Sequence, residues 1–132
     1  MSFLIDTDIC SAEIKGHHRV SNRFIQYSGR LWISTVTLAE LYVWGSRAKA
    51  SPKRLQSVSN LLKQVQVLGV DEIAAYRFGR VRAWQLDHGL LSPDLDLLNA
   101  AVALRHGLTV VTHNLADYDN VSGLTKVDWM AP

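Results

Sequence analysis

Cysteine is nearly absent from this chain, which has a single one, Cys10, among its 132 residues. One cysteine cannot form an internal disulfide bond, and it excludes a metal site built from several thiolates. Long hydrophobic runs are also missing, since no apolar stretch approaches the ~18 residues that a membrane-spanning helix needs. Near the N-terminus, Asp6 stands where a signal peptide would continue with apolar residues. These absences favour a cytoplasmic protein with no membrane partner.

The rest of the composition is typical of a folded globular domain, with 48% apolar and 20% charged residues. A chain of this length can bury one substantial core but not two, so residues 1–132 are expected to form a single domain. The net charge of +2 is too small to identify a partner. Two groups of basic residues could contact a phosphate backbone or could simply be solvated surface: Arg77, Arg80 and Arg82, and Arg47, Lys49, Lys53 and Arg54.

Short apolar strands alternate with helical segments along the chain. The expected strands are residues 2–5, 31–33, 65–68 and 109–112, with a last one around Val127. The expected helices are residues 7–15, 17–27, 36–44, 72–88 and 94–106, with a further one that opens at Ser51-Pro52. Such alternation predicts an α/β fold in which helices flank a mostly parallel central sheet.

Capping residues mark several of these helix ends. Ser34, Asp71 and Ser92 each precede a helical segment, which they are predicted to cap. Gly89 and Gly107 follow two helical segments and are predicted to end them. In an open α/β sheet the functional site forms beyond the carboxyl ends of the strands. Residues that directly follow the predicted strands are therefore candidates for the site.

Four carboxylates stand out because of their surroundings: Asp6, Glu40, Asp96 and Asp117. The first three lie within strongly apolar runs that contain no Lys or Arg, and Asp117 lies in a polar turn. A lone ionised carboxylate in apolar surroundings is strongly unfavourable unless a positive charge compensates it. A hard divalent cation with oxygen ligands is an economical source of that charge. The four acids therefore indicate a metal-dependent enzyme.

Helical spacing adds polar companions to two of these acids. Asn99 lies one turn after Asp96 on the same helix face, and Thr37 lies one turn before Glu40. Each acid also has a purely structural explanation, because Asp is a common N-cap, a single Glu is usually solvated, and an acid in a first helical turn interacts favourably with the helix dipole. The set of four is more informative than any one member.

Three segments carry a pattern whose order and spacing extend over nearly the whole chain. They read FLIDTDI at residues 3–9, ISTVTLAEL at 33–41, and DLDLLNAA from residue 94, running on to HGLTVVTHN at 106–114. In this pattern the chain resembles the PIN-domain endoribonucleases, in particular the toxins of VapBC toxin–antitoxin pairs. The resemblance implies a three-layer α/β sandwich and a homodimer that cleaves RNA, such as tRNA, with Mg²⁺ or Mn²⁺. It also implies a small VapB-type antitoxin that lies across the site and holds the toxin inactive.

The resemblance extends to individual acidic positions. Asp6, Glu40 and Asp96 match the three acids on which the family depends. The fourth acidic position varies in the family, and here it falls on Asp117 or is filled in part by Asn114. The number of metal ions stays open, because two neighbouring positions depart from the family pattern. Asp8 stands where many relatives carry Asn or Ser, and Asn99 stands where an aliphatic residue is common.

For the reaction, we expect Asp6 and Asp96 to be metal ligands, either directly or through water. Glu40 is expected to orient the attacking water or to act as a general base, and Asp117 to support a second ion. These roles require Asp6, Glu40 and Asp96 to converge within reach of one ion. Three further residues are expected to hydrogen-bond to these groups: Thr7, Thr112 and Asn114.

Two other functions compete with this reading. The motif Asp6-Thr7-Asp8 also resembles the first motif of haloacid-dehalogenase-type phosphatases, which use an aspartate nucleophile. That family expects Thr or Val in place of Cys10 and a late Gly-Asp pair, and neither is present. The second alternative is a non-catalytic RNA-binding or interaction module, against which the complete set of acids argues.

Overall fold

Five parallel strands form the central sheet of the computed structural model, which describes residues 1–132. The strands lie in the order β3-β2-β1-β4-β5, so β1 is central and is bordered by β2 and β4. All neighbouring pairs are parallel, which confirms the predicted sheet. The strands are β1 (Phe3–Ile5), β2 (Leu31–Ser34), β3 (Gln66–Leu68), β4 (Thr109–Val111) and β5 (Lys126–Val127).

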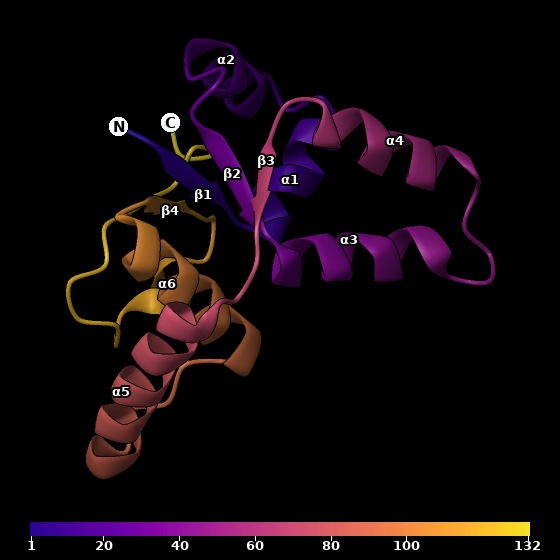
Figure 1. Ribbon diagram of the computed structural model, residues 1–132. Coiled ribbons are helices and arrows are strands. Elements are labelled where there is room, and N and C mark those ends of the chain that lie inside the picture. The colour runs from indigo at the N-terminus through magenta and orange to yellow at the C-terminus, as the bar shows by residue number, and fades with distance from the viewer.

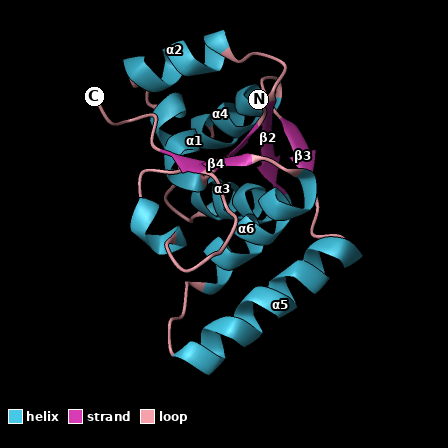
Figure 2. Cartoon of the chain, turned by 90° about the vertical axis from the view of Figure 1, so that its left-hand side faces the viewer, coloured by secondary structure: helices cyan, strands magenta, loops and turns pink.

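Helices cover both faces of this sheet and complete a three-layer α/β fold. The helical segments are α1 (Thr7–Ile14), α2 (His18–Gln26), α3 (Thr35–Ser46), α4 (Lys53–Leu62), α5 (Glu72–His88), α6 (Asp94–His106) and the short 3-10 helix η1 (Leu115–Tyr118). Figure 2 shows α1 and α4 above the sheet and α5 and α6 below it. In Figure 1, α3 leads away from the sheet, and α4 runs back toward the sheet alongside α3. No helix is both long and apolar enough to cross a membrane.

The hydrophobic core is divided between the two faces of the sheet. Successive residues of a strand point to opposite faces. Phe3 and Ile5 of β1 therefore pack in one cluster with residues of α1, α2 and α4, whereas Leu4 packs in the other cluster with residues of α6. Burial on both faces fixes the position of β1 and so of the residue that follows it, Asp6.

The strand order reverses beside β1, and this reversal locates the site. From β1 the chain continues to β2 and β3 on one side, then crosses to β4 and β5 on the other side. Such a switch point leaves a crevice beyond the carboxyl ends of the two strands that flank it. Asp6 follows β1 and Thr112 follows β4 at this edge, while Ser34 is the last residue of β2.

Most of the predicted helix caps are confirmed, but one is wrong. The Ser34 hydroxyl accepts a hydrogen bond from the Thr37 backbone N–H at 3.1 Å, and Asp71 caps α5 in the same way. Ser92 was predicted to cap α6, yet Pro93 is the residue that precedes the helix and no side chain caps it. The Ser92 hydroxyl instead accepts a hydrogen bond from the Gln85 amide at 2.9 Å. A tertiary partner therefore prevails over the local capping pattern.

Candidate active site at the carboxyl edge of the sheet

Asp6 is a buried carboxylate whose two oxygens are fully hydrogen-bonded. Oδ1 accepts from the Thr7 backbone N–H at 2.8 Å and from Asn99 Nδ2 at 3.2 Å. Oδ2 accepts from the Thr112 hydroxyl at 2.9 Å and from the Tyr118 phenol at 3.0 Å. Four donors match the roughly four lone-pair positions of a carboxylate. Asp6 thus caps α1, as its structural explanation predicted, and is also fixed in the site by Thr112 after β4, Tyr118 of η1 and Asn99 of α6.

Glu40 reaches the same region from α3. It is half-buried, and its Oε1 accepts a hydrogen bond from the Thr7 hydroxyl at 2.6 Å. Thr7 directly follows Asp6, so this bond connects the first helical turn of α1 to the acid-bearing face of α3. The other oxygen of Glu40 has no hydrogen bond within the chain. One carboxylate oxygen is thereby held in place while the other is available.

Asp96 is the carboxylate whose electrostatic environment is most unfavourable. Burial and the negative charges of Asp6, Asp117, Glu40 and Asp8, in that order of effect, together raise its pKa from 3.8 to about 7. These four acids can act on Asp96 only because they lie near it, although they are far apart in sequence. None of the five forms an ion pair with Lys or Arg. The five carboxylates therefore lie near one another without an internal counter-charge.

Asp8 belongs to the same group of acids, and Asn114 contacts Asp8. Burial and the charge of Asp6 raise the pKa of Asp8. Its Oδ2 accepts from the His113 backbone N–H at 2.9 Å and from Asn114 Nδ2 at 3.4 Å. Asp117 lies exposed on η1 and makes no side-chain hydrogen bond. Its role in supporting a second ion, and that of Asn114 as a partial substitute, remain predictions.

The donor set suits a hard divalent cation, but it is not a preformed cage. No group of three or more His, Cys, Asp or Glu side chains is arranged to hold a metal ion, so the expectation that Asp6, Glu40 and Asp96 converge within reach of one ion is not met. Mg²⁺ usually retains several waters and takes one or two carboxylates. Asp96 and Glu40, with free oxygens, fit that demand. Asp6 could contribute through a bridging water, or directly if one of its four donors moves away.

A second layer of polar residues lies beneath the acids, and sequence reasoning found only part of it. Thr7 and Thr112 donate to Glu40 and Asp6 as predicted. Tyr118 was missed, because a tyrosine in a polar turn gives no sign that its phenol reaches the first strand. Burial and the charges of Asp6 and Asp96 raise the pKa of this phenol, so it stays protonated and can donate. Three more buried residues belong to this layer and are hydrogen-bonded to one another: Ser34, Thr37 and Asn99.

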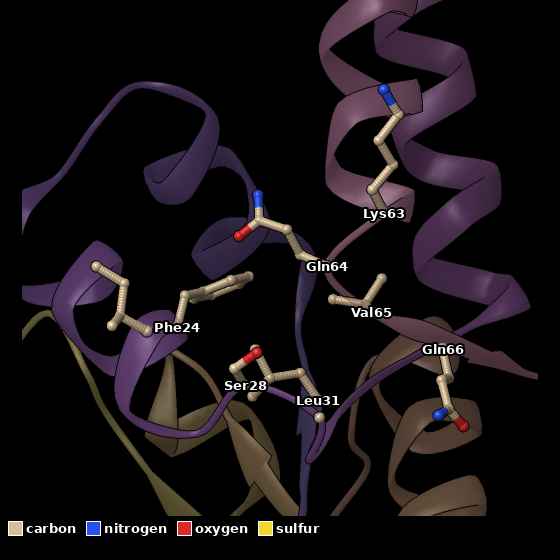
Figure 3. Close-up of a pocket in the computed structure, with 9 residues that line it drawn as sticks. Phe24, Ser28, Leu31, Lys63, Gln64, Val65 and Gln66 are labelled. Carbon is tan, nitrogen blue, oxygen red and sulfur yellow. The ribbon is translucent and has the colours of Figure 1, made fainter.

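One cavity at the opposite edge of the sheet lies far from the acids. A cavity of about 500 Å³ is bounded by α2 and by the starts of β2 and β3, which is the edge opposite to the site. Figure 3 shows Phe24, Leu31 and Val65 on its walls, with the Lys63 ammonium pointing away from them. Lys63 is the only ionisable residue that lines it. This cavity therefore lacks the Asp, Glu, His or Cys side chains that catalysis or metal binding usually requires.

Comparison with protein families agrees with the fold. Residues 3–124 match the family model described as PIN domain. The chain belongs to the PIN-domain family. The resemblance noted from the sequence is therefore confirmed, and the three-layer fold with its parallel sheet is the PIN fold.

Individual relatives place this PIN domain among the VapC proteins. It is 32% identical to a protein named tRNA(fMet)-specific endonuclease VapC from Shigella flexneri over 130 residues, covering 98% of each chain. A protein of the same name from Salmonella typhimurium is 31% identical, again covering 98% of each. Among solved structures, the crystal structure of DNA-bound VapBC from Salmonella typhimurium contains a chain that superposes with a TM-score of 0.92 at 31% identity, with 98% of both chains covered.

Proposed function

We propose that this protein is a Mg²⁺-dependent endoribonuclease toxin of the VapC type. The observation that carries the proposal is the convergence of uncompensated carboxylates on Asp96 at the switch point of the sheet. The names of the VapC relatives, which include endonuclease and ribonuclease, support the same reaction class. A partly buried acidic cluster without a counter-charge fits a site that acts with a divalent cation on an anionic substrate.

Different residues of the site have different proposed roles in phosphodiester hydrolysis. A divalent cation, when bound, supplies positive charge that stabilises the transition state and lowers the pKa of water. Asp96 is the residue that would hold it directly, and Asp6 would do so through a bridging water. Asp6 keeps its orientation through its four hydrogen bonds, and Asp96 offers oxygens that no residue of the chain engages. Mn²⁺ has the same preference for oxygen ligands and is expected to substitute for Mg²⁺.

Glu40 is the residue that can accept the proton of the attacking water. The Thr7 hydroxyl holds Oε1, so the lone pairs of Oε2 remain available for this proton. The oxygen of the water forms a new bond to phosphorus, one P–O ester bond breaks, and the leaving oxygen takes a proton from solvent. General-base catalysis of this kind contributes typically ~10²–10⁴-fold to the rate.

RNA is the proposed substrate, and tRNA is the first class to test. Both basic groups seen in the sequence contain exposed cations that pair with no carboxylate, and in the α5 group these are Arg77 and Arg80. Arg47 and Lys49 are exposed beside a hollow of about 520 Å³, and neither pairs with a carboxylate. In the other group, Arg82 is engaged by Asp94 at 2.8 Å and by the Ser92 carbonyl at 3.1 Å.

A VapB-type antitoxin is the proposed partner, because the relative of known structure from Salmonella typhimurium is described as VapBC. Beside Glu40 lies a largely apolar hollow of about 390 Å³, to which Val36, Val43 and Leu95 contribute. Val43 is 64% exposed and Leu95 47% exposed, which is unfavourable for apolar side chains in water.

A homodimer is also proposed. Light scattering of the purified protein tests this proposal by measuring its mass in solution.

The decisive experiment incubates the purified protein with tRNA and with total RNA, in Mg²⁺ or in EDTA, and maps the cut ends. Cleavage is expected only with the metal, and Glu40→Gln is expected to abolish it. Metal uptake without cleavage would indicate the non-catalytic binding module instead. Cleavage that persists equally in EDTA and in Glu40→Gln would overturn the proposed mechanism. The phosphatase alternative predicts a trapped aspartyl-phosphate, which the four donors on Asp6 disfavour.

A further inference from the structure

Asn99 connects the three acid-bearing elements through one buried amide. Only 2% of its surface is exposed. Its Nδ2 donates to Asp6 Oδ1 and to the Thr37 hydroxyl, both at 3.2 Å, and its Oδ1 accepts from the Ser34 hydroxyl. Ser34 in turn accepts from the Thr37 backbone N–H. The amide therefore joins α6 to the end of β1, to α3 and to the end of β2.

The positions of Asn99 and Thr37 on their helices connect this amide to the acids Asp96 and Glu40. Asn99 lies three residues after Asp96 on α6, and Thr37 lies three residues before Glu40 on α3. Residues three apart lie on the same face of a helix, about one turn from each other. A hydrogen bond between Asn99 and Thr37 thus sets the distance between the turns that carry Asp96 and Glu40. The second hydrogen bond, to Asp6, fixes both turns relative to the end of β1.

We propose that Asn99 is the positioning residue that sets the relative places of Asp6, Glu40 and Asp96 in this protein. The inference rests on the proposed function, in which those three carboxylates act together. Asp96 makes no side-chain hydrogen bond of its own, so its location depends on how α6 is held. The other donors to Asp6 are Thr7 of α1, Thr112 after β4 and Tyr118 of η1, and none of them belongs to α3 or α6.

The main test replaces Asn99 with leucine, which has a similar size but no polar group. In Asn99→Leu, kcat for RNA cleavage is expected to fall by about 10- to 100-fold, while KM changes by less than about threefold. The affinity for Mn²⁺, measured by calorimetry without RNA, is expected to weaken about tenfold. An Asn99→Leu protein with wild-type kcat and wild-type Mn²⁺ affinity would overturn the proposal.

Gln85 offers a matched control, because it is the other buried amide with several tertiary hydrogen bonds. It is 0% exposed, and its Nε2 donates to the Ser92 hydroxyl and to the Asn120 carbonyl. Gln85→Leu is expected to lower the melting temperature by at least as much as Asn99→Leu. Its kcat and its Mn²⁺ affinity are expected to stay at the wild-type values. Equal losses of activity in the two variants would show that Asn99 supports only the fold.

Thr37→Val provides a second route to the same answer if Asn99→Leu does not fold. Valine keeps the shape of threonine and removes the hydroxyl that accepts from Asn99. Thr37→Val is expected to lower kcat about tenfold, and the double variant is expected to lose less than the product of the two single effects. Fully multiplicative losses would contradict a shared positioning role.

The design separates this inference from the proposed function. If the wild type cleaves RNA and both variants cleave equally well, the positioning role fails and the nuclease assignment stands. If the wild type binds Mn²⁺ but cleaves no RNA, the nuclease assignment fails, and the Mn²⁺ affinities of the variants still decide the role of Asn99. If the wild type shows neither, both proposals are overturned.

Discussion

Two buried amides, Asn99 and Gln85, make similar hydrogen bonds in very different surroundings. Both are almost completely buried, and each satisfies two acceptors with its nitrogen. The partners of Gln85 are a hydroxyl and backbone groups, all neutral, and they join α5 to the loop before α6 and to Asn120. One partner of Asn99 is the carboxylate of Asp6, which lies among other carboxylates.

The comparison shows what distinguishes a functional polar cluster from a structural one. No buried side-chain nitrogen or oxygen in the molecule lacks a hydrogen-bond partner, so satisfied bonding is common to both regions. Charge compensation is not common to both regions. On the Gln85 side Asp94 pairs with Arg82 at 2.8 Å, whereas the acids near Asn99 have no basic partner. Uncompensated charge, rather than burial alone, marks the site.

The largest expected effect separates two aspartates that lie two residues apart on α6. Asp96→Asn is expected to lower kcat at least ~10²-fold, because it removes a charge that would hold the cation. Asp94→Asn removes only an exposed partner of Arg82 and is expected to leave kcat within about twofold of the wild type. Steady-state cleavage of one RNA substrate measures both. Equal losses in the two variants would break the distinction between the regions.

A structural effect of intermediate size is expected on the Gln85 side. Ser92→Ala removes the hydroxyl that accepts from Gln85 Nε2 in a buried position. The unsatisfied donor is expected to reduce the free energy of unfolding by about 1–3 kcal/mol. The activity of the folded protein is expected to be unchanged. Urea denaturation combined with a cleavage assay measures both quantities, and a loss of kcat without a loss of stability would contradict this assignment.

Thr7→Val tests whether the orientation of Glu40 matters. The variant removes the hydroxyl that donates to Glu40 Oε1 at 2.6 Å and leaves the backbone N–H that donates to Asp6. We expect kcat to fall about tenfold with little change in KM, since a less constrained base spends less time in the productive orientation. If kcat is unaffected while Glu40→Gln is inactive, Glu40 does not need this hydrogen bond.

A further expected effect is a dependence of stability on pH that arises in the site. The pKa of Asp96 is raised from 3.8 to about 7 in the folded protein. The proton is therefore bound more tightly in the folded state, and the stability it contributes is present below about pH 4 and lost as the pH rises through 7. In EDTA, the melting temperature of Asp96→Asn relative to the wild type is expected to rise from pH 4 to pH 7 and to level off above it.

The matched variant for this pH experiment is again Asp94→Asn. Asp94 is exposed and paired with Arg82, so its replacement is expected to give a melting-temperature difference that does not increase between pH 4 and pH 7. A flat difference for Asp96→Asn over the same range would show that the carboxylates do not interact as the structure indicates.

Much of the fold could be predicted because its signals are local. Apolar runs of three or four residues gave the strands, and Ser34, Asp71, Gly89 and Gly107 mark helix ends as expected. These features depend on hydrogen bonds that span only a few residues. Ser92 shows the limit, because its capping pattern is real but a residue seven positions earlier takes its hydroxyl.

The identities of the acids were also evident from the sequence, since carboxylates without basic neighbours in apolar runs need compensation wherever they lie. The bonds that hold them were not evident. Tyr118 donates to Asp6 across 112 positions and Asn99 across 93. Those contacts exist because β1 lies between β2 and β4 and because α3 and α6 meet beside its end. The sequence by itself determined which groups carry the charge, and only the packing of distant segments decided which neighbours hold them.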